Sequence, residues 1–160
     1  DLGRVAQLIN KTNQFNPTTR RCSVGELTEI ANLPGTITLQ FRLADRFGDN
    51  GLISAMVLRP TADDPAVLEI DLWVMSCRVF GRQLEFEAMN IAVEAALRSG
   101  VRAIRATYIP SEKNGVVAGL YESLGFKRVD RPAATEGTSH WDLQVNEYIA
   151  RRTFLERKAA

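Results

Sequence analysis

The sequence predicts a mixed α/β fold, and three observations lead to that class. From Thr36 to Leu43 apolar and polar residues alternate strictly, which is typical of a half-buried strand. From Leu84 to Leu97 two neighbouring apolar stripes recur at helical spacing, and so broad a surface implies a helix packed on a sheet. A further strand over 101–109 follows this helix, so strands joined by hairpins come first and a β-α-β unit comes after them. We therefore expect a mixed, mostly antiparallel sheet flanked by helices.

Two helices are expected before the first strand. Apolar residues recur at helical spacing from Leu2 to Ile9, and this helix ends near residues 13–17, because a proline disfavours the helical conformation in the residue before it. The loop that follows is polar and aromatic, so contact with a substrate or carrier protein is an alternative to plain turn chemistry. Ser23 and Glu26 then fit a capping box, in which each side chain satisfies an exposed backbone amide. A short helix should begin there and stop at residues 33–35.

Three strands follow, and a polar turn joins the first two. The turn over 45–51 contains Asn50-Gly51, which tolerates the positive φ of tight hairpins. Residues 52–58 are apolar enough for a strand buried on both faces, and residues 67–75 form the next strand. In that strand we expect one face to carry Leu68, Ile70, Leu72 and Val74, and the other to carry Glu69, Asp71, Trp73 and Met75.

The second half of the chain alternates helices and strands. After the long helix and the strand over 101–109, apolar residues from Val116 to Leu124 mark a helix that Gly125 closes. A last strand is expected over 141–145, and a charged tail follows it.

The composition is that of an ordinary globular protein, and it argues against several classes of function. With 160 residues, of which 45% are hydrophobic and 24% charged, we expect one domain over residues 1–160. The net charge of +1 argues against a mainly electrostatic nucleic-acid binder, and no apolar run is long enough to span a bilayer. Two cysteines and the single His140 make neither a disulfide framework nor a multi-histidine zinc site, so no metal is expected. Without a signal peptide, the expected setting is cytoplasmic.

A basic glycine loop joins the 67–75 strand to the long helix. Its sequence is Arg78-Val79-Phe80-Gly81-Arg82, and such a junction aims unpaired backbone N–H groups at one point, where the helix dipole favours an anion. Gly81 lets the backbone approach closely, and the arginines can add charge-assisted hydrogen bonds. Pyrophosphate is the natural ligand of such a loop. The alternative is a plain strand-to-helix turn with solvated arginines.

A second motif favours the anion site. This motif reads Asn114-Gly115-Val116-Val117-Ala118-Gly119-Leu120-Tyr121-Glu122-Ser123-Leu124-Gly125-Phe126. It resembles the Asn…Tyr-x-x-x-Gly-Phe signature of the GNAT acyltransferase superfamily. Arg78-x-x-Gly81-x-Gln83 falls where that superfamily has its Gln/Arg-x-x-Gly-x-Gly/Ala pyrophosphate loop, and the order and separation of the two motifs match. Gln83 departs from the pattern, because Gly or Ala is usual there and its side chain could crowd the phosphates.

The GNAT resemblance implies a site for acetyl-CoA, another acyl-CoA or a phosphopantetheine thioester. The strands over 67–75 and 101–109 would splay to admit the pantetheine arm, Asn114 would bind the cofactor, and Tyr121 could protonate the departing thiolate. The residues implied to contact the arm or the pyrophosphate are Trp73, Val74, Met75, Arg78, Phe80, Gly81, Arg82 and Gln83.

A narrower resemblance covers nearly the whole chain. The stretches 8–16, 45–51, 76–82 and 108–110 look like FkbH-like proteins of polyketide assembly, which join a HAD-type phosphatase-like domain to a C-terminal GNAT-like domain. Members load a glyceryl unit onto the phosphopantetheine of an acyl carrier protein. This chain matches only the C-terminal part, begins at Asp1 rather than methionine, and has no Asp-x-Asp phosphatase motif. The resemblance implies a domain excised from a larger protein with an N-terminal HAD-type domain, and an acyl carrier protein as partner.

Cys77 and Asp71 are further catalytic candidates. Cys77 could hold an acyl group as a thioester, since Arg78, Arg82 and the helix N-terminus would lower its pKa. The alternative is a small residue that ends the strand. Asp71 could act as a general base if burial raises its pKa, with Glu69 as the weaker choice, and a structural salt bridge is the alternative for each.

Three functions remain open from the sequence. The first is acyl transfer involving a phosphopantetheine thioester within an FkbH-like protein. The second is a non-catalytic module that docks the carrier protein while the HAD-type domain does the chemistry, and both Gln83 and the lack of an obvious base favour it. The third is a small-molecule N-acetyltransferase that uses acetyl-CoA, which fits the fold motifs but not the four FkbH-like stretches.

Overall fold

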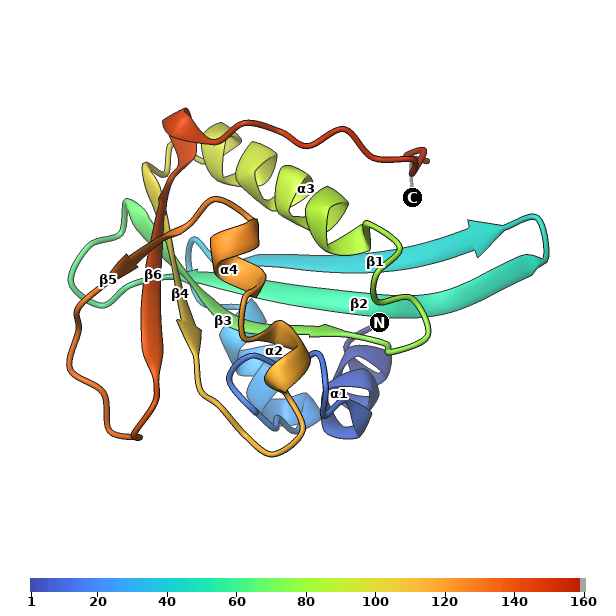
Figure 1. The fold of residues 1–160 in the computed structure, drawn as a ribbon, viewed down its shortest axis with the longest axis horizontal. Helices are drawn as coiled ribbons and strands as arrows, with labels where there is room; N and C mark the ends of the chain where they lie inside the picture. The colour runs from blue at the N-terminus through green and yellow to red at the C-terminus, as the bar shows by residue number, and fades with distance from the viewer. Residues whose placement is uncertain (159–160) are drawn as a thin grey trace.

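The chain folds around one six-stranded sheet, and the structure, a computed structural model, describes residues 1–158 (Figure 1). The strand order across the sheet is β1-β2-β3-β4-β6-β5. Neighbouring strands are antiparallel except β3 and β4, which run parallel. The mixed, mostly antiparallel sheet that the sequence predicts is therefore confirmed. The strands are β1 (Ile37–Asp45), β2 (Gly48–Pro60), β3 (Val67–Met75), β4 (Ala103–Tyr108), β5 (Lys127–Val129) and β6 (Ser139–Gln144).

Helices cover both faces of the sheet. α3 and α4 pack on one face over the larger part of the core, and α1 and α2 pack on the other face over a smaller part (Figure 1). Small residues of α3, among them Ala88, Ala92 and Ala96, are fully buried, so this helix lies close to the strands. The helices are α1 (Leu2–Lys11), α2 (Val24–Ala31), α3 (Leu84–Arg98), α4 (Leu120–Ser123) and the 3₁₀ turns η1 (Gly115–Val117) and η2 (Val145–Glu147).

Both N-terminal helices begin at side-chain caps. The Asp1 carboxylate accepts a hydrogen bond from Gly3 N at 3.0 Å, and Ser23 Oγ accepts one from Glu26 N at 3.1 Å. Each cap satisfies a backbone amide that has no partner inside the helix. The Ser23 half of the predicted capping box is thus present, and α2 begins at Val24 as expected.

A β-bulge at Asp71 changes the predicted faces of β3. Val57 pairs with Leu72 and Leu58 pairs with Ile70, so Asp71 is an extra residue on the β3 side. The expected alternation is wrong beyond this point, because the extra residue shifts the period by one position. The α3 side of the sheet receives Leu68, Ile70, Trp73 and Met75, and the α1 side receives Leu72 and Val74.

The region expected as one helix from Val116 to Leu124 is broken in two. It forms η1 and then the four-residue α4, and Gly125 closes it with a φ of +91° as the sequence predicts. β5, which pairs with β6, was not predicted, since three residues are too few for a periodic pattern.

The packing of α2 on the sheet predicts which apolar residues contribute most to the free energy of unfolding. Leu27 of α2 is fully buried, whereas Leu33 just beyond that helix is 46% exposed. Leu27→Ala should lower the free energy of unfolding by about 2–5 kcal/mol, because it removes apolar contacts and leaves a cavity. Leu33→Ala should change it by less than about 1 kcal/mol. Urea denaturation of both variants measures this, and equal losses would contradict the described packing of α2.

Candidate functional site

The predicted thioester site lies where β3 and β4 separate. Their parallel ladder has three residue pairs, and the last joins Glu69 to Arg105. Beyond it β3 continues to Met75 and β4 continues to Tyr108, and the two strands do not pair with each other again. The splay that the GNAT resemblance implies is therefore present in the fold.

Residues Phe15–Pro17, here called the strap, fill the wide end of the gap between β3 and β4. Met75 N donates a hydrogen bond to Phe15 O at 3.3 Å, and these two residues form an isolated antiparallel bridge. On the other side of the gap Ile109 N donates to Pro17 O at 2.8 Å. Trp73, two residues before Met75, presents its own backbone N–H and C=O to the same gap, between the strap and the end of the ladder.

Aromatic rings pack together beneath the strap. Phe15 is 1% exposed and meets the Trp73 ring edge-on, with 5.1 Å between the ring centroids. Its centroid also lies 5.4 Å from that of Phe80, in the basic loop. Trp73 then contacts Tyr121, which packs on Phe126. A series of ring contacts thus connects Phe80 of the loop, through Phe15 and Trp73, to Tyr121 and Phe126 of the second motif.

Asn114 is fully buried and holds the strap in place. Its Nδ2 donates to Asn16 O at 3.1 Å and to Ile109 O at 2.9 Å. Its Oδ1 accepts hydrogen bonds from Ser111 N at 2.8 Å and from Tyr108 Oη at 3.4 Å. An amide group has two donors and two acceptor positions, so partners inside the chain use all of them. The predicted cofactor contact of Asn114 requires one of these bonds to open.

The buried hydroxyl group of Tyr121 favours its protonated form. The side chain is 2% exposed, and burial raises the pKa of its hydroxyl far above the ordinary value. The hydroxyl therefore stays protonated at neutral pH and can serve as a proton donor but not as a base. Its contact with Trp73, at 6.4 Å between ring centroids, places it beside the gap.

The backbone of the basic loop between β3 and α3 is accessible from solvent at Gly81. Gly81 has a φ of +87°, and no atom lies within 4 Å of the position that a Cβ would take there. Arg82 contacts the Asp45 carboxylate at 3.5 Å, and Arg78 Nε donates to Ser76 Oγ at 3.3 Å. Both contacts are long, and both arginine side chains are exposed to solvent beside the loop.

The C-terminal tail crosses the start of α3. Gln83 has a φ of +66°, and its Oε1 accepts a hydrogen bond from Phe154 N at 2.9 Å, so this side chain is directed to the tail. Glu87, in the first turn of α3, accepts from Thr153 Oγ1 at 2.6 Å and pairs with Arg157 at 2.7 Å. The charged tail, which the sequence analysis left without a role, therefore covers one side of the predicted phosphate site.

Asp71 and Cys77 do not come together. The Asp71 carboxylate is largely buried between Arg20, at 3.4 Å, and Arg59, at 3.7 Å, which is the salt-bridge alternative that the sequence left open. About 13 Å of extended strand separates it from Met75, and Cys77 lies exposed beyond that residue. The two side chains cannot act on the same atom in this arrangement, and their catalytic roles stay predictions.

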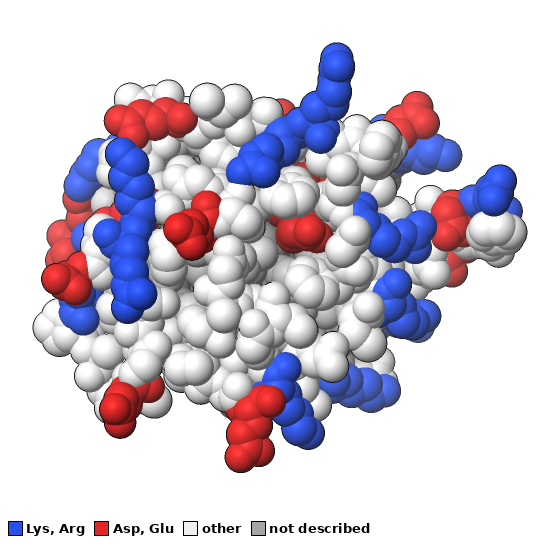
Figure 2. Space-filling model, in the orientation of Figure 1, with Lys and Arg blue, Asp and Glu red and all other residues white. Residues whose placement is uncertain are grey.

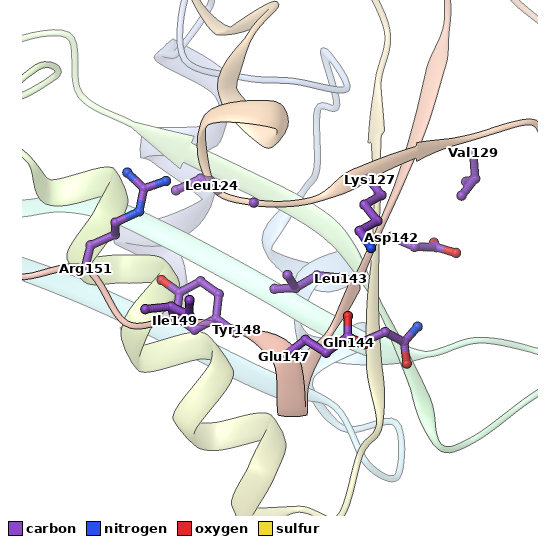
Figure 3. Close-up of a pocket in the computed structure, with 11 residues that line it drawn as sticks. Leu124, Lys127, Val129, Asp142, Leu143, Gln144, Glu147, Tyr148, Ile149 and Arg151 are labelled. Carbon is purple, nitrogen blue, oxygen red and sulfur yellow. The ribbon is translucent and has the colours of Figure 1, made fainter.

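A sizeable hollow of the surface lies elsewhere. It has a volume of about 670 Å³ and is bounded by β5, β6 and the tail beyond η2, as Figure 3 shows. Tyr148 on its wall donates to Asn90 Oδ1 at 2.5 Å, and Arg151 stacks on Phe86 and bonds the Ser123 carbonyl. Leu124 and Gly125 of the second motif line this hollow, but none of the predicted catalytic or cofactor-binding residues does.

Residues 1–158 contain no cluster of three or more His, Cys, Asp or Glu side chains that could hold a metal ion. In the same part of the chain, no helix is both long and apolar enough to cross a membrane.

Comparison with known proteins identifies the fold. No family model and no curated sequence matches the chain. Among solved structures, the ribosomal-protein-S18-alanine N-acetyltransferase from Escherichia coli matches with a TM-score of 0.66 at 12% identity, over 96% of this chain and 94% of that one. The acetyltransferase of the GNAT family from Streptococcus pneumoniae matches with a TM-score of 0.66 at 18% identity, over 90% and 93%.

A third structure was solved with a ligand. It is yncA from Salmonella typhimurium with its cofactor acetyl-CoA, which matches with a TM-score of 0.62 at 17% identity, over 94% of this chain and 91% of that one. The chain therefore has the GNAT fold, and these identities extend the likeness no further than the fold.

The buried Tyr121 predicts how stability depends on pH. In the unfolded chain the hydroxyl ionises near pH 10, whereas burial holds its folded-state pKa well above that value. Above pH 10 the unfolded state therefore loses the proton first, and stability falls as the pH rises. Between pH 9 and pH 11 the free energy of unfolding should fall less in Tyr121→Phe than in wild type. Urea denaturation at both pH values measures this, and equal losses would contradict the burial of the hydroxyl.

Proposed function

We propose that this domain transfers an acyl group, such as glyceryl, from a phosphopantetheine thioester to the thiol of a second phosphopantetheine in polyketide assembly. Its partners would be an acyl carrier protein and the N-terminal HAD-type domain of an FkbH-like protein. The observation that carries the proposal is the separation of β3 from β4 directly beside the Gly81 loop at the start of α3. A linear arm can lie in such a gap while its phosphate binds the loop. The GNAT fold and the FkbH-like stretches support the same reaction class.

The phosphate end of the site fits a carrier-bound arm better than free coenzyme A. Arg78 and Arg82 supply two positive charges, which suffice for one phosphodiester. The Gln83 side chain and the tail meet at the start of α3, directly beside the loop, so additional phosphates would have little space there. We therefore favour a carrier-protein thioester over acetyl-CoA or another acyl-CoA.

A basic surface beside the loop supports an acidic partner. Arg4 and Lys11 of α1 line a hollow together with Asn50 of β2 and Arg78 of the loop. Figure 2 shows Lys and Arg side chains gathered at the end of the molecule where α1 and the β1–β2 hairpin lie. Complementary charge speeds encounter and fixes orientation, so a partner with acidic groups around its prosthetic arm would be guided to this end.

Within this proposal each residue has a defined task. A bound acyl thioester supplies the activated carbonyl and the thiolate that leaves. Arg78 and Arg82 bind the phosphate, and the rings of Trp73 and Phe80 exclude water from the gap. The acceptor thiol attacks the carbonyl, the bond to the original sulfur breaks, and Tyr121 donates its proton to that leaving sulfur, because burial keeps the hydroxyl protonated. The proton that the acceptor thiol loses restores the hydroxyl.

A second candidate function is a non-catalytic docking module for the carrier protein. The observation that favours it is Asp71, whose carboxylate is neutralised by two arginines and so offers no evident base. A small-molecule N-acetyltransferase using acetyl-CoA is the third candidate, and it rests on the fold alone.

Tyr121→Phe separates the first two candidates. We expect kcat for acyl transfer in the full-length protein to fall by about 10²-fold or more with little change in KM, since general acid catalysis contributes about 10²–10⁴-fold. Tyr148→Phe removes a half-buried hydroxyl that lies outside the gap and should leave kcat unchanged. If Tyr121→Phe and Cys77→Ala both load the carrier at the wild-type rate, the docking module becomes the better account.

The arginines of the loop predict a salt-sensitive affinity. Replacing both Arg78 and Arg82 by alanine should raise the Kd for S-acetyl-phosphopantetheine about tenfold or more, because two charge-assisted hydrogen bonds are lost. Arg98→Ala, at the other end of α3, is the matched control and should leave Kd unchanged. Isothermal titration at two salt concentrations measures both. An unchanged Kd in the double variant would exclude the loop as the phosphate site.

A further inference from the structure

The strap occupies the positions that an amide-bearing arm would use. Pantetheine is a linear arm with two amide groups, so an extended site must offer it backbone donors and acceptors. In the gap, Met75 N and Ile109 N are such donors, and both are bound to carbonyl groups of the strap. The strap thus lies between β3 and β4 as a short peptide that is hydrogen-bonded to one residue on each side.

The anchor of the strap is also a residue assigned to ligand binding. Asn114 donates to Asn16 O, in the middle of the strap, and the resemblance implies that the same residue binds the cofactor. The amide group cannot bind both partners with that donor at once. Departure of the strap would free this donor of Asn114 together with the amides of Met75 and Ile109.

Three features weaken the attachment of the strap, although Phe15 and Asn16 are buried. The bridge to β3 is a single residue pair, and its hydrogen bond of 3.3 Å is long. The Oδ1 of Asn16 is buried without a partner among residues 1–158. Thr19, just after the strap, has a φ of +57°, a conformation that is costly for a β-branched residue. A segment with these defects can leave at lower cost than a strand of the ladder.

The base of the strap, in contrast, is firmly fixed. The Arg21 guanidinium donates to Ile9 O at 2.7 Å and to Thr12 O at 2.8 Å. These bonds tie the two ends of the 12–21 segment to α1 and to each other. The segment can therefore move as a closed loop between α1 and α2 without unfolding either helix.

We propose that the strap is an internal stand-in for the thioester arm, and that the arm binds by displacing it from the gap. The inference rests on the proposed function and adds the regulation of the same site. With the strap in place the wide end of the gap is shut. With the strap displaced, Met75, Ile109 and Asn114 offer their donors to the amides of the arm, and Trp73 lines its path.

A reversible lock tests this proposal. In a Cys77→Ser background, Phe15→Cys and Met75→Cys place two thiols on a bridged antiparallel pair, whose Cα separation of about 4.5–5.5 Å suits a disulfide. S-acetyl-phosphopantetheine is the probe, and acetyl-CoA is titrated in parallel to distinguish an arm from the full nucleotide. We expect the oxidised protein to bind the probe at least tenfold more weakly than the same protein after reduction.

The controls keep the outcome interpretable. A second lock, Lys127→Cys with Asp142→Cys, joins paired residues of β5 and β6 at the far edge of the sheet and should bind equally when oxidised and reduced. Equal binding by both redox forms of the strap lock would overturn the strap proposal and leave the proposed function standing. If no form, wild type included, binds either probe, the proposed function fails and the strap inference fails with it.

Hydrogen exchange of the wild-type protein gives an independent check that needs no engineered cysteine. On addition of S-acetyl-phosphopantetheine, the segment over 12–19 should lose protection while Trp73 to Met75 keeps or gains it. Unchanged or increased protection of residues 12–19 in the presence of bound probe would show that the arm and the strap coexist, and would overturn the proposal.

Discussion

The three-pair ladder between β3 and β4 is the constraint on which the rest of the structure depends. Two parallel strands that separate after Glu69 and Arg105 leave buried backbone N–H and C=O groups that need partners. Along the gap these partners come from outside the sheet. The strap satisfies Met75 and Ile109, and the Asn114 side chain satisfies the carbonyl groups of Asn16 and Ile109. The same edges make this gap a place where an extended ligand could pair with β3 on one side and with β4 on the other.

The bulge at Asp71 determines which side chains face this gap. Because the bulge shifts the alternation of β3 by one position, Trp73 and Met75 lie on the α3 side with Phe15, Phe80 and Tyr121. Without it Trp73 would lie under α1, and the aromatic contacts beneath the strap could not form. The extra residue also directs the Asp71 carboxylate to Arg20 and Arg59, which makes it an ion-pair partner in this conformation.

The sequence was most informative where one local signal decides the structure. Alternation predicted β1 and β3, Ser23 predicted the start of α2, and Gly81 marked a loop that does adopt a positive φ. The bulge could not be predicted, since Leu72 and Val74 are apolar on either face. Likewise, the roles of the strap and the tail depend on partners far along the chain. Asn114 lies 98 residues from Asn16, and Phe154 lies 71 residues from Gln83.

The central claim is that a thioester arm binds in the gap between β3 and β4. The chain has two tryptophans, and they make this claim directly testable by ¹H–¹⁵N NMR of the indole groups. The Trp73 indole is buried beside the strap, whereas Trp141 lies on β6, on the other side of β4 from the gap, and donates to Ser139 Oγ at 2.9 Å. Titration with S-acetyl-phosphopantetheine should shift the Trp73 indole signal and leave that of Trp141 unchanged. Saturable binding that shifts neither signal, or only that of Trp141, would contradict the account.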